Sequence, residues 1–281
     1  MKKYLKKKWI WVLVLCVLTV WVLWANTALE VHTYQVESCR IPEGFSGFRI
    51  VQISDLHNAR FGEENRKLLD KIKAQQPDII LLTGDLVDSS RTDLEIAIHF
   101  AEKAALIAPV YYVTGNHEAW IGTYGDLKTG LEAAGVTVLE NEKVRIARGK
   151  DFITLAGIHD PSFLIGRDDA AAVGAAIRSL QAEEDGYTVL LSHRPELFET
   201  YTETGVDLVF SGHAHGGQFR IPLLGGLVAP NQGLFPKYDA GMFLSGNTCM
   251  IVSRGLGNSV IPLRFCNRPE IVVAELIYIP Q

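Results

Sequence analysis

Cysteine is scarce in this sequence, with four among 281 residues. The four do not form the kind of cluster that holds structural zinc, so a metal site here would need oxygen and nitrogen ligands. They do not define a disulfide framework either, because one lies in an apolar N-terminal run and three remain. A single bridge between the last two stays open. The positions are Cys16, Cys39, Cys249 and Cys266.

Basic residues are not in excess. The formal net charge is −5, and five lysines fall within the first eight residues, so the rest of the chain carries −10. Nonspecific binding to nucleic acid depends on neutralising phosphates with Lys and Arg. We therefore expect no nucleic-acid partner.

Charge is absent from residues 9–25. A run of this length lies near the short limit for crossing the bilayer core, about 17 to 25 residues. Tryptophans at both of its ends suit the two membrane interfaces. The run is longer than the apolar region of a signal peptide, about 7 to 15 residues. We interpret it as a retained transmembrane anchor, with secretion after signal cleavage as the alternative.

This interpretation divides the chain into four parts. Residues 1–8 form a basic segment that stays in the cytosol, because lysine-rich flanks are retained there. Residues 9–25 form the anchor, and residues 26–47 a tether that leads into a first strand. Residues 48–281 form one domain outside the cytosol.

The domain repeats one pattern, in which an apolar, β-branched run ends in a polar cluster and a helical or loop segment follows. Strands alternating with helices predict βαβ units and a largely buried sheet. Ligands in such folds bind at the carboxyl ends of the strands, which is where each polar cluster falls. The runs are 48–53, 79–82, 110–113, 188–191 and 206–210, and the predicted helices are 63–75, 93–106, 126–134 and 168–182.

The C-terminal part has a different pattern. Residues 238–245 and 248–253 flank Gly246-Asn247, a two-residue hairpin signal. Residues 270–279 alternate in part as a further strand. We expect antiparallel pairing here that completes a second sheet.

Two histidines, His213 and His215, follow the last run, and in an extended segment they point the same way. Neutral imidazole is a common ligand of transition metals. Seven ligand-type residues at the five strand ends are too many for one ion but suit two ions that share a carboxylate. Two ions about 3.5 to 4 Å apart can hold a hydroxide and stabilise both the attacking and the leaving oxygen at phosphorus. The seven are Asp55, His57, Asp85, Asn116, His193, His213 and His215.

The order and spacing of these clusters resemble the calcineurin-like metallophosphoesterases over roughly residues 48–281. Residues 192–196 and 216–218 further resemble the membrane-associated branch typified by bacterial phosphodiesterases of the YkuE and YaeI type, which is similar to hydrolases of UDP-2,3-diacylglucosamine. The resemblance implies a four-layer α-β-β-α sandwich in which helices flank two mixed sheets. The matching motifs are Asp55-x-His57, Gly84-Asp85-x-x-Asp88, Gly115-Asn116-His117-Glu118, His193 and Gly212-His213-x-His215.

The resemblance also implies a role for each residue and two divalent ions per chain, drawn from Mn, Zn, Fe and Co. Asp85 would bridge the two ions. His117 would be the general acid that protonates the leaving oxygen or steadies the developing charge. The first ion would be held by Asp55, His57 and His215, and the second by Asn116, His193 and His213.

Five further residues keep open interpretations. Asp88 and Glu118 would orient imidazoles, and a helix cap is the alternative for Asp88. Arg60 and Arg194 lie beside ligand clusters and could bind a substrate phosphate, or they could form surface salt bridges. His159 follows another predicted strand at 152–158 and is structural or lines the substrate site.

Residues 219–235 are apolar and rich in glycine and proline. We favour a buried loop-and-strand excursion, and the alternative is an apolar lip that admits an acyl chain or touches the bilayer.

Together these features predict a membrane-anchored phosphoesterase with two metal ions, acting on phosphodiesters or pyrophosphates rather than monoesters. One alternative is a hydrolase of a phospho- or nucleotide-linked glycolipid, such as UDP-2,3-diacylglucosamine. A protein phosphatase and a catalytically silent scaffold are further alternatives. The scaffold is disfavoured because both sets of ligands and His117 are present.

Overall fold

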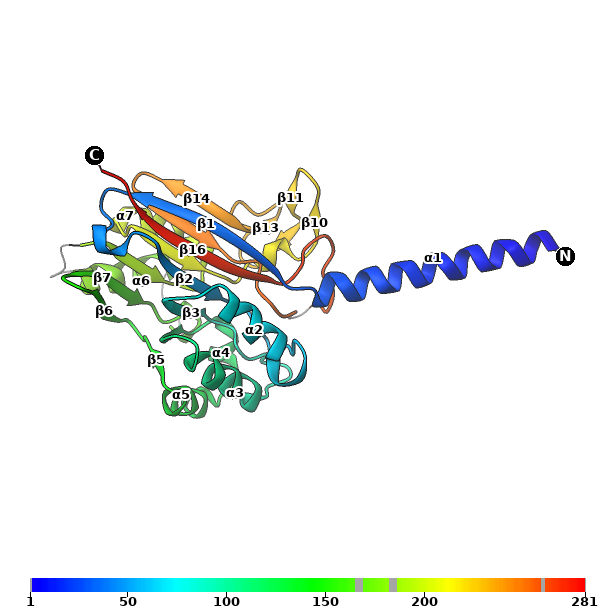
Figure 1. Ribbon diagram of the computed structural model, residues 1–281, viewed down its shortest axis with the longest axis horizontal. Helices are drawn as coiled ribbons and strands as arrows, with labels where there is room; N and C mark the ends of the chain where they lie inside the picture. The colour runs from blue at the N-terminus through cyan, green and yellow to red at the C-terminus, as the bar shows by residue number, and fades with distance from the viewer. Residues whose placement is uncertain (1, 165–168, 182–185, 259–260, 281) are drawn as a thin grey trace.

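The computed structural model describes residues 2–164, 169–181, 186–258 and 261–280. A long N-terminal helix, α1 (Lys2–Thr27), projects from one end of the body (Figure 1). Its stretch Lys8–Thr27 is long and apolar enough to cross a membrane, by length and composition.

The first sheet has six strands in the order β1-β16-β2-β3-β4-β5. Strands β2 to β5 are parallel, whereas β16 is antiparallel to β2 and parallel to β1. The carboxyl ends of β2, β3 and β4 therefore lie at one edge. The bounds are β1 Glu30–Ser38, β2 Phe48–Ile53, β3 Ile79–Thr83, β4 Val110–Val113, β5 Val136–Val138 and β16 Glu270–Tyr278.

The second sheet has six strands in the order β14-β15-β9-β8-β7-β6. Strands β7, β8, β9 and β15 are parallel, and the edge strands β6 and β14 are antiparallel to their neighbours. The predicted hairpin through Gly246-Asn247 is the turn between β14 and β15. The bounds are β6 Glu142–Arg148, β7 Asp151–Gly157, β8 Thr188–Leu191, β9 Leu208–Ser211, β14 Gly241–Ser245 and β15 Thr248–Val252.

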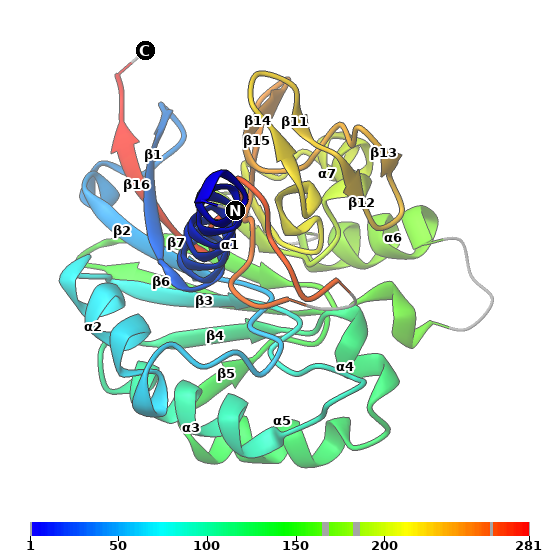
Figure 2. The same ribbon diagram turned by 90° about the vertical axis from the view of Figure 1, so that its right-hand side faces the viewer.

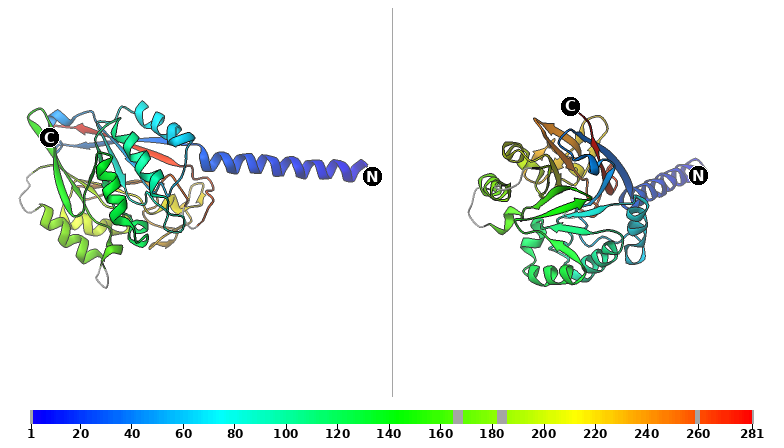
Figure 3. Two further views of the ribbon diagram at one scale, coloured as in Figure 1. Left: turned by 90° about the horizontal axis from the view of Figure 1, so that it is seen from below. Right: turned by 60° about the vertical axis from the view of Figure 1, so that its left-hand side comes forward.

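Helices cover the outer face of each sheet, and the inner faces pack on one another (Figures 2 and 3). Side-chain alternation along the strands builds these layers, because successive residues point to opposite faces. In β2, Ile50 packs between the sheets and Val51 packs against the outer helices. The expected four-layer α-β-β-α sandwich is thereby confirmed. The outer helices are α2 Arg66–Ala74, α3 Leu94–Ala105 and α5 Tyr124–Ala133 on the first sheet, and α6 Asp169–Gln181 and α7 Phe198–Thr204 on the second.

Short elements form the loops around the strand ends. They include the helix α4 (Asn116–Trp120) and the hairpins β10–β11 and β12–β13. The hairpin strands are β10 Arg220–Ile221, β11 Gly225–Gly226, β12 Val228–Ala229 and β13 Gly233–Leu234. The 3-10 turns are η1 Glu43–Phe45, η2 Glu63–Asn65, η3 Pro161–Phe163, η4 Pro195–Leu197 and η5 His215–Gly217.

The structure corrects two expectations from the sequence and answers one question that the sequence left open. Strand β16 joins the first sheet, between β1 and β2, and not the second. The helix predicted over 63–75 begins as α2 at Arg66, because η2 and the left-handed Asn65 precede it. All four cysteines are free, so there is no bridge between Cys249 and Cys266.

Candidate metal centre

The predicted ligand residues come together where five strands end. Strands β2, β3 and β4 supply them from the first sheet, and β8 and β9 from the second. All seven are at most 7% exposed. They are Asp55, His57, Asp85, Asn116, His193, His213 and His215.

One group consists of Asp55, His57, Asp85 and His215, whose ligand-type atoms lie within 4.8 Å of one another. The Nε2 atoms of His57 and His215 are 3.1 Å apart, and Nε2 of His215 is 3.4 Å from Oδ1 of Asp55. Two imidazole nitrogens beside carboxylate oxygens match the ligand types that zinc and related ions prefer.

A second group consists of Asp85, His193 and His213. Oδ1 of Asn116 and Nε2 of His193 are both buried and lack a hydrogen-bond partner among the described residues. A buried polar atom without a partner costs about 1 to 3 kcal/mol. A cation bound between these atoms would satisfy both, so the residues present fit the ion that the motifs imply.

Asp85 lies between the two groups. Its Oδ1 accepts the backbone N–H of His117 at 2.8 Å. Its Oδ2 lies 3.6 Å from Nε2 of His57 and 3.2 Å from Nε2 of His193. One oxygen of this carboxylate is therefore fixed by the backbone, and the other faces a histidine of each group.

A hydrogen bond on the far side of the ring orients the imidazole of His193. Its Nδ1 lies 2.7 Å from the carbonyl oxygen of Thr83, to which it donates, so Nε2 faces the cluster. Nδ1 of His215 lies 3.4 Å from Nη2 of Arg264. Arg264 is fully buried, and its burial lowers the pKa to about 10. The sequence analysis missed Arg264, because a lone arginine in an irregular loop carries no motif.

Burial sets the protonation of most of these histidines. Desolvation lowers the pKa of His57 to about 4 and those of His213 and His215 well below the usual value, so all three are neutral ligands at pH 7. Burial also opposes charge on His193, but the carboxylates of Asp85 and Asp55 outweigh it and raise the pKa to about 10. An ion at His193 would have to displace that proton.

Five of the seven residues have a left-handed backbone, which non-glycine residues adopt at a cost of about 1 to 2 kcal/mol each. Such strain persists where the surroundings impose it, and it clusters at functional sites. The φ values are 52° for Asp55, 46° for His57, 52° for Asp85, 63° for His213 and 48° for His215.

His117 is the second residue of α4 and lines a cleft that lies over the ligand residues. Its Nδ1 accepts the backbone N–H of Ser89 at 2.9 Å. A neutral ring that accepts at Nδ1 carries its proton on Nε2. His117 therefore offers an N–H donor, which is what the predicted proton donor to a leaving oxygen needs.

Glu118 does not orient an imidazole as expected. In the described part of the chain, its hydrogen bonds all come from backbone N–H groups, those of Asp85, Leu86, Val87 and Gly115, at 2.7 to 3.3 Å. Burial and the charge of Asp85 raise its pKa to about 8, while the N–H donors oppose that shift. Glu118 ties the loop after β3 to the loop after β4.

Asp88 accepts the backbone N–H and the hydroxyl of Ser90, and pairs with Arg91 at 3.2 Å. It forms a turn and no helix cap, since α3 is capped by Asp93. Its carboxylate also lies within 4.8 Å of ring nitrogens of His57 and His117, so the expected role beside the imidazoles keeps its geometric basis.

Arg194 is buried and forms two hydrogen bonds with Asp160, at 2.7 and 3.0 Å. It is thus no surface pair, and its Nη1 lies 3.1 Å from Nε2 of His213, inside the cleft. His159 packs on Phe163, with ring centroids 3.9 Å apart, and Thr114 Oγ1 is 3.2 Å from its Nδ1. These contacts give His159 a packing role.

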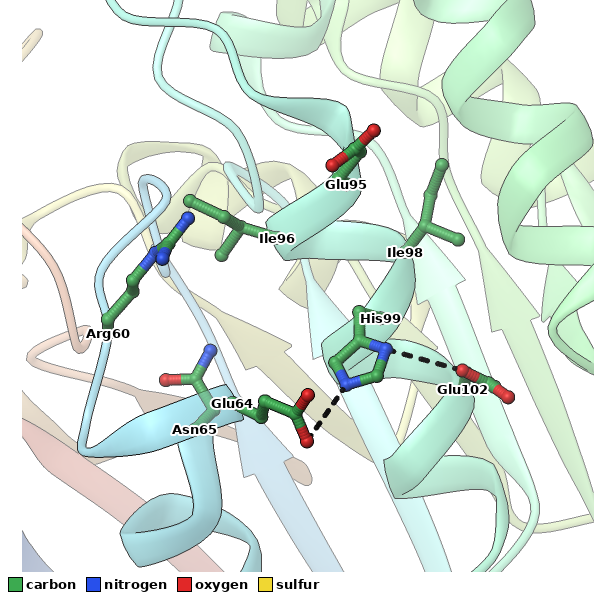
Figure 4. A pocket seen from close by; sticks show the side chains of 8 residues that line it. All are labelled: Arg60, Glu64, Asn65, Glu95, Ile96, Ile98, His99 and Glu102. Carbon is green, nitrogen blue, oxygen red and sulfur yellow. Dashed lines mark ion pairs between the residues drawn. The ribbon is translucent and has the colours of Figure 1, made fainter.

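Arg60 does not reach the cluster. Its side chain is 67% exposed and lies 3.7 Å from the carboxylate of Asp93. It lines a different pocket, in which His99 forms ion pairs with Glu64 and Glu102 (Figure 4). The surface salt bridge is therefore the interpretation that the structure favours for Arg60.

A cleft of about 600 Å³ lies over the cluster. Asp85, Asn116, His117 and His213 form part of its polar lining. Apolar residues line another part, and the segment 219–235 supplies half of them. They are Trp120, Ala214, Val228, Ala229, Pro230 and Ile261.

The expectation that 219–235 is a buried excursion is wrong. Leu223, Leu224, Leu234 and Phe235 are 105%, 68%, 70% and 60% exposed. The alternative, an apolar lip, agrees with these exposures.

Gly115 holds the loops after β3 and β4 in contact, and we expect Gly115→Ala to lose most activity. An added Cβ would lie 2.2 Å from Oδ1 of Asp85, so the loops must separate. Overpacking of this kind costs about 1 to 3 kcal/mol. Melting temperature and diester hydrolysis measure both effects. Gly125→Ala is the control, because an added Cβ there meets nothing within 4 Å, and equal loss in both variants would contradict the argument.

Comparison with known proteins agrees with this geometry. The family model described as calcineurin-like phosphoesterase matches residues 48–217. The uncharacterized metallophosphoesterase YkuE of Bacillus subtilis is 32% identical over 88% of this chain and 85% of its own length. Phosphodiesterase YaeI of Escherichia coli is 31% identical over 82% of each chain. The structure of TT1561 from Thermus thermophilus superposes with a TM-score of 0.53 at 14% identity, covering 74% of this chain and 90% of that one.

Proposed function

The chain belongs to the calcineurin-like phosphoesterase family and is a phosphoester-hydrolysing enzyme, and from this premise we propose that it is a dinuclear phosphodiesterase anchored at a membrane. The observation that carries the proposal is the position of Asp85, whose Oδ2 faces a histidine of each ligand group. A carboxylate shared between the two groups suits a pair of adjacent ions.

In this proposal Asp55, His57 and His215 hold one ion, and Asn116, His193 and His213 hold the other. The ions, when bound, supply an activated water and stabilise charge on phosphoryl oxygens. Their identity stays within the set Mn, Zn, Fe and Co, which fits nitrogen and oxygen ligands.

Two other polar residues of the cleft act on the substrate: one donates a proton, and the other binds a phosphoryl oxygen. His117 donates from Nε2 to the leaving oxygen, and the Ser89 N–H on its Nδ1 fixes the ring. Arg194, held by Asp160, presents Nη1 to a phosphoryl oxygen. A diester carries one fewer charge than a monoester, so a single guanidinium is sufficient to bind it. The relative YaeI is named a phosphodiesterase, which supports the same preference for diesters over monoesters.

A lipid-linked phosphoester is the second candidate substrate. The observation that favours it is the apolar part of the cleft, which includes Val228, Ala229, Pro230 and Ile261. An acyl chain could pack there while the phosphate reaches His117. Comparing acylated with deacylated forms of one phosphoester tests this, and equal kcat/KM for both would remove the candidate.

The anchor in this proposal is α1. Its segment Lys8–Thr27 satisfies the length and hydropathy of a membrane span, and only 6% of the most apolar window is buried within the structure. The lysine cluster before it supports a cytosolic N-terminus and a domain on the other side.

Removing divalent metal is expected to inactivate the enzyme and lower its melting temperature, because an ion that binds only the folded chain stabilises it. At a free ion concentration about 100-fold above Kd, the stabilisation is about 2.7 kcal/mol. Elemental analysis should find two ions per chain, and fewer in His213→Ala and His215→Ala. His99→Ala is the control, because His99 is a partly exposed histidine outside both ligand groups. A metal-free chain with undiminished diester hydrolysis would overturn the proposal.

A further inference from the structure

Apolar side chains face solvent around the base of α1. They belong to the hairpins β10–β11 and β12–β13 and to the segment 261–266, and we name them the apolar rim. Exposed apolar groups gathered in one region mark interaction sites on proteins. The rim consists of Leu223, Leu224, Leu234, Phe235, Leu263 and Phe265, which are between 36% and 105% exposed.

Backbone and side-chain contacts join the parts of the rim. The N–H of Arg220 donates to the carbonyl of Phe265 at 2.9 Å, and Phe219 forms a β-bridge with Phe265. Nε2 of Gln218 donates to the carbonyls of Ile261 and Leu263, both at 2.8 Å. The first hairpin and the segment 261–266 are therefore one surface.

The last turns of α1 pack on this surface. The rings of Trp21 and Phe265 meet edge to face with centroids 4.9 Å apart. Oδ1 of Asn26 accepts the backbone N–H of Arg264 at 2.8 Å. The guanidinium of Arg268 lies 4.4 Å from the ring centre of Trp24. The helix is thus held against the body and not joined to it by a free linker.

These contacts determine where the rim lies. The hairpins and the segment 261–266 are at the end of the body from which α1 projects (Figures 1 and 3). If α1 crosses a bilayer, whatever surrounds its exit lies at the membrane surface. Tryptophan near the exit, here Trp21 and Trp24, is typical of the interface between lipid and water.

We propose that the apolar rim inserts into the leaflet from which α1 emerges, so that the domain contacts the bilayer at two places. This inference rests on the anchor in the proposed function. Ile261 and the β12–β13 hairpin also line the cleft, so the mouth of the cleft opens beside the lipid. Phosphoesters carried in that leaflet would reach the site without leaving the membrane.

The test places an environment-sensitive nitrobenzoxadiazole label on Leu223→Cys in the full chain, reconstituted in vesicles of phosphatidylcholine and phosphatidylglycerol. The exposed Cys16, Cys39 and Cys266 are replaced by serine. The control is Leu106→Cys, 78% exposed, which lies beyond α3 just before β4 begins, at the sheet edge opposite the metal centre.

Spin-labelled lipids should quench the label at Leu223 several-fold more than the label at Leu106, and aqueous iodide should show the reverse. Equal iodide quenching at both positions would contradict insertion of the apolar rim into the leaflet. A label shielded from both quenchers indicates a protein contact and also overturns it. Vesicle flotation after an alkaline wash tests the anchor separately, and hydrolysis of bis-p-nitrophenyl phosphate by the same samples tests the metal site. Loss of flotation would contradict both membrane anchoring by α1 and insertion of the apolar rim.

Discussion

Asp85→Asn is expected to lower kcat for diester hydrolysis by about three orders of magnitude, equal to about 4 kcal/mol of transition-state stabilisation. The backbone N–H of His117 donates to Oδ1 of Asp85. The side-chain oxygen of asparagine can accept the same hydrogen bond, so the loop keeps its conformation. The substitution removes the negative charge that two cations would share. Steady-state kinetics and elemental analysis measure the effect.

The matched control is Asp126→Asn, an exposed carboxylate in the first turn of α5. It should leave kcat and the metal content unchanged. Circular dichroism should show the same fold in both variants. Full activity of Asp85→Asn, with two ions still bound, would refute a bridging role.

His117→Ala is expected to lower kcat by about 10² to 10⁴-fold when the leaving group is an alkyl alcohol. An alkoxide needs a proton as it departs, and His117 supplies the N–H donor on Nε2. p-Nitrophenolate leaves without such help, so the loss on an aryl ester should be much smaller. Rates on a series of diesters with different leaving groups measure this dependence, and the metal content should stay at two.

His159→Ala serves as the comparison, because His159 packs on Phe163 and Tyr124 outside the described lining of the cleft. The melting temperature of His159→Ala should fall. The dependence of its kcat on the leaving group should match that of the unaltered enzyme. A His117→Ala variant with that same dependence would show that His117 acts only as a structural residue.

The sequence could predict the site because each ligand follows a recognisable strand. The apolar runs before Asp55, Asp85 and His193 each end where a sheet presents its carboxyl edge, so residues far apart in the chain had to converge. The layers were implied by the family resemblance, and the structure shows their physical basis, since Ile50 and Val51 of β2 pack on opposite faces of the sheet.

Other features depend on tertiary context that local patterns do not contain. Arg264 is buried beside His215, and nothing in its neighbours in sequence indicates this. Glu118 has the spacing of an imidazole partner but accepts backbone N–H groups. The segment 219–235 reads as core by hydropathy, yet Leu223 is fully exposed, because its two-stranded hairpins are too short to bury it.

Strand β16 separates β1 from β2 in the first sheet, with Glu30 opposite Glu270 and Val272 opposite Gln52. During synthesis, residues 30–53 emerge long before residues 270–278, so this sheet cannot close until β16 has been made. A contact between segments this far apart in sequence is also slow to form, because a long loop must be closed first. The domain can therefore finish folding only once β16 is available to pair with β1 and β2. A chain that stops before Glu270 would keep its α1 but expose two unpaired strand edges, which favour aggregation.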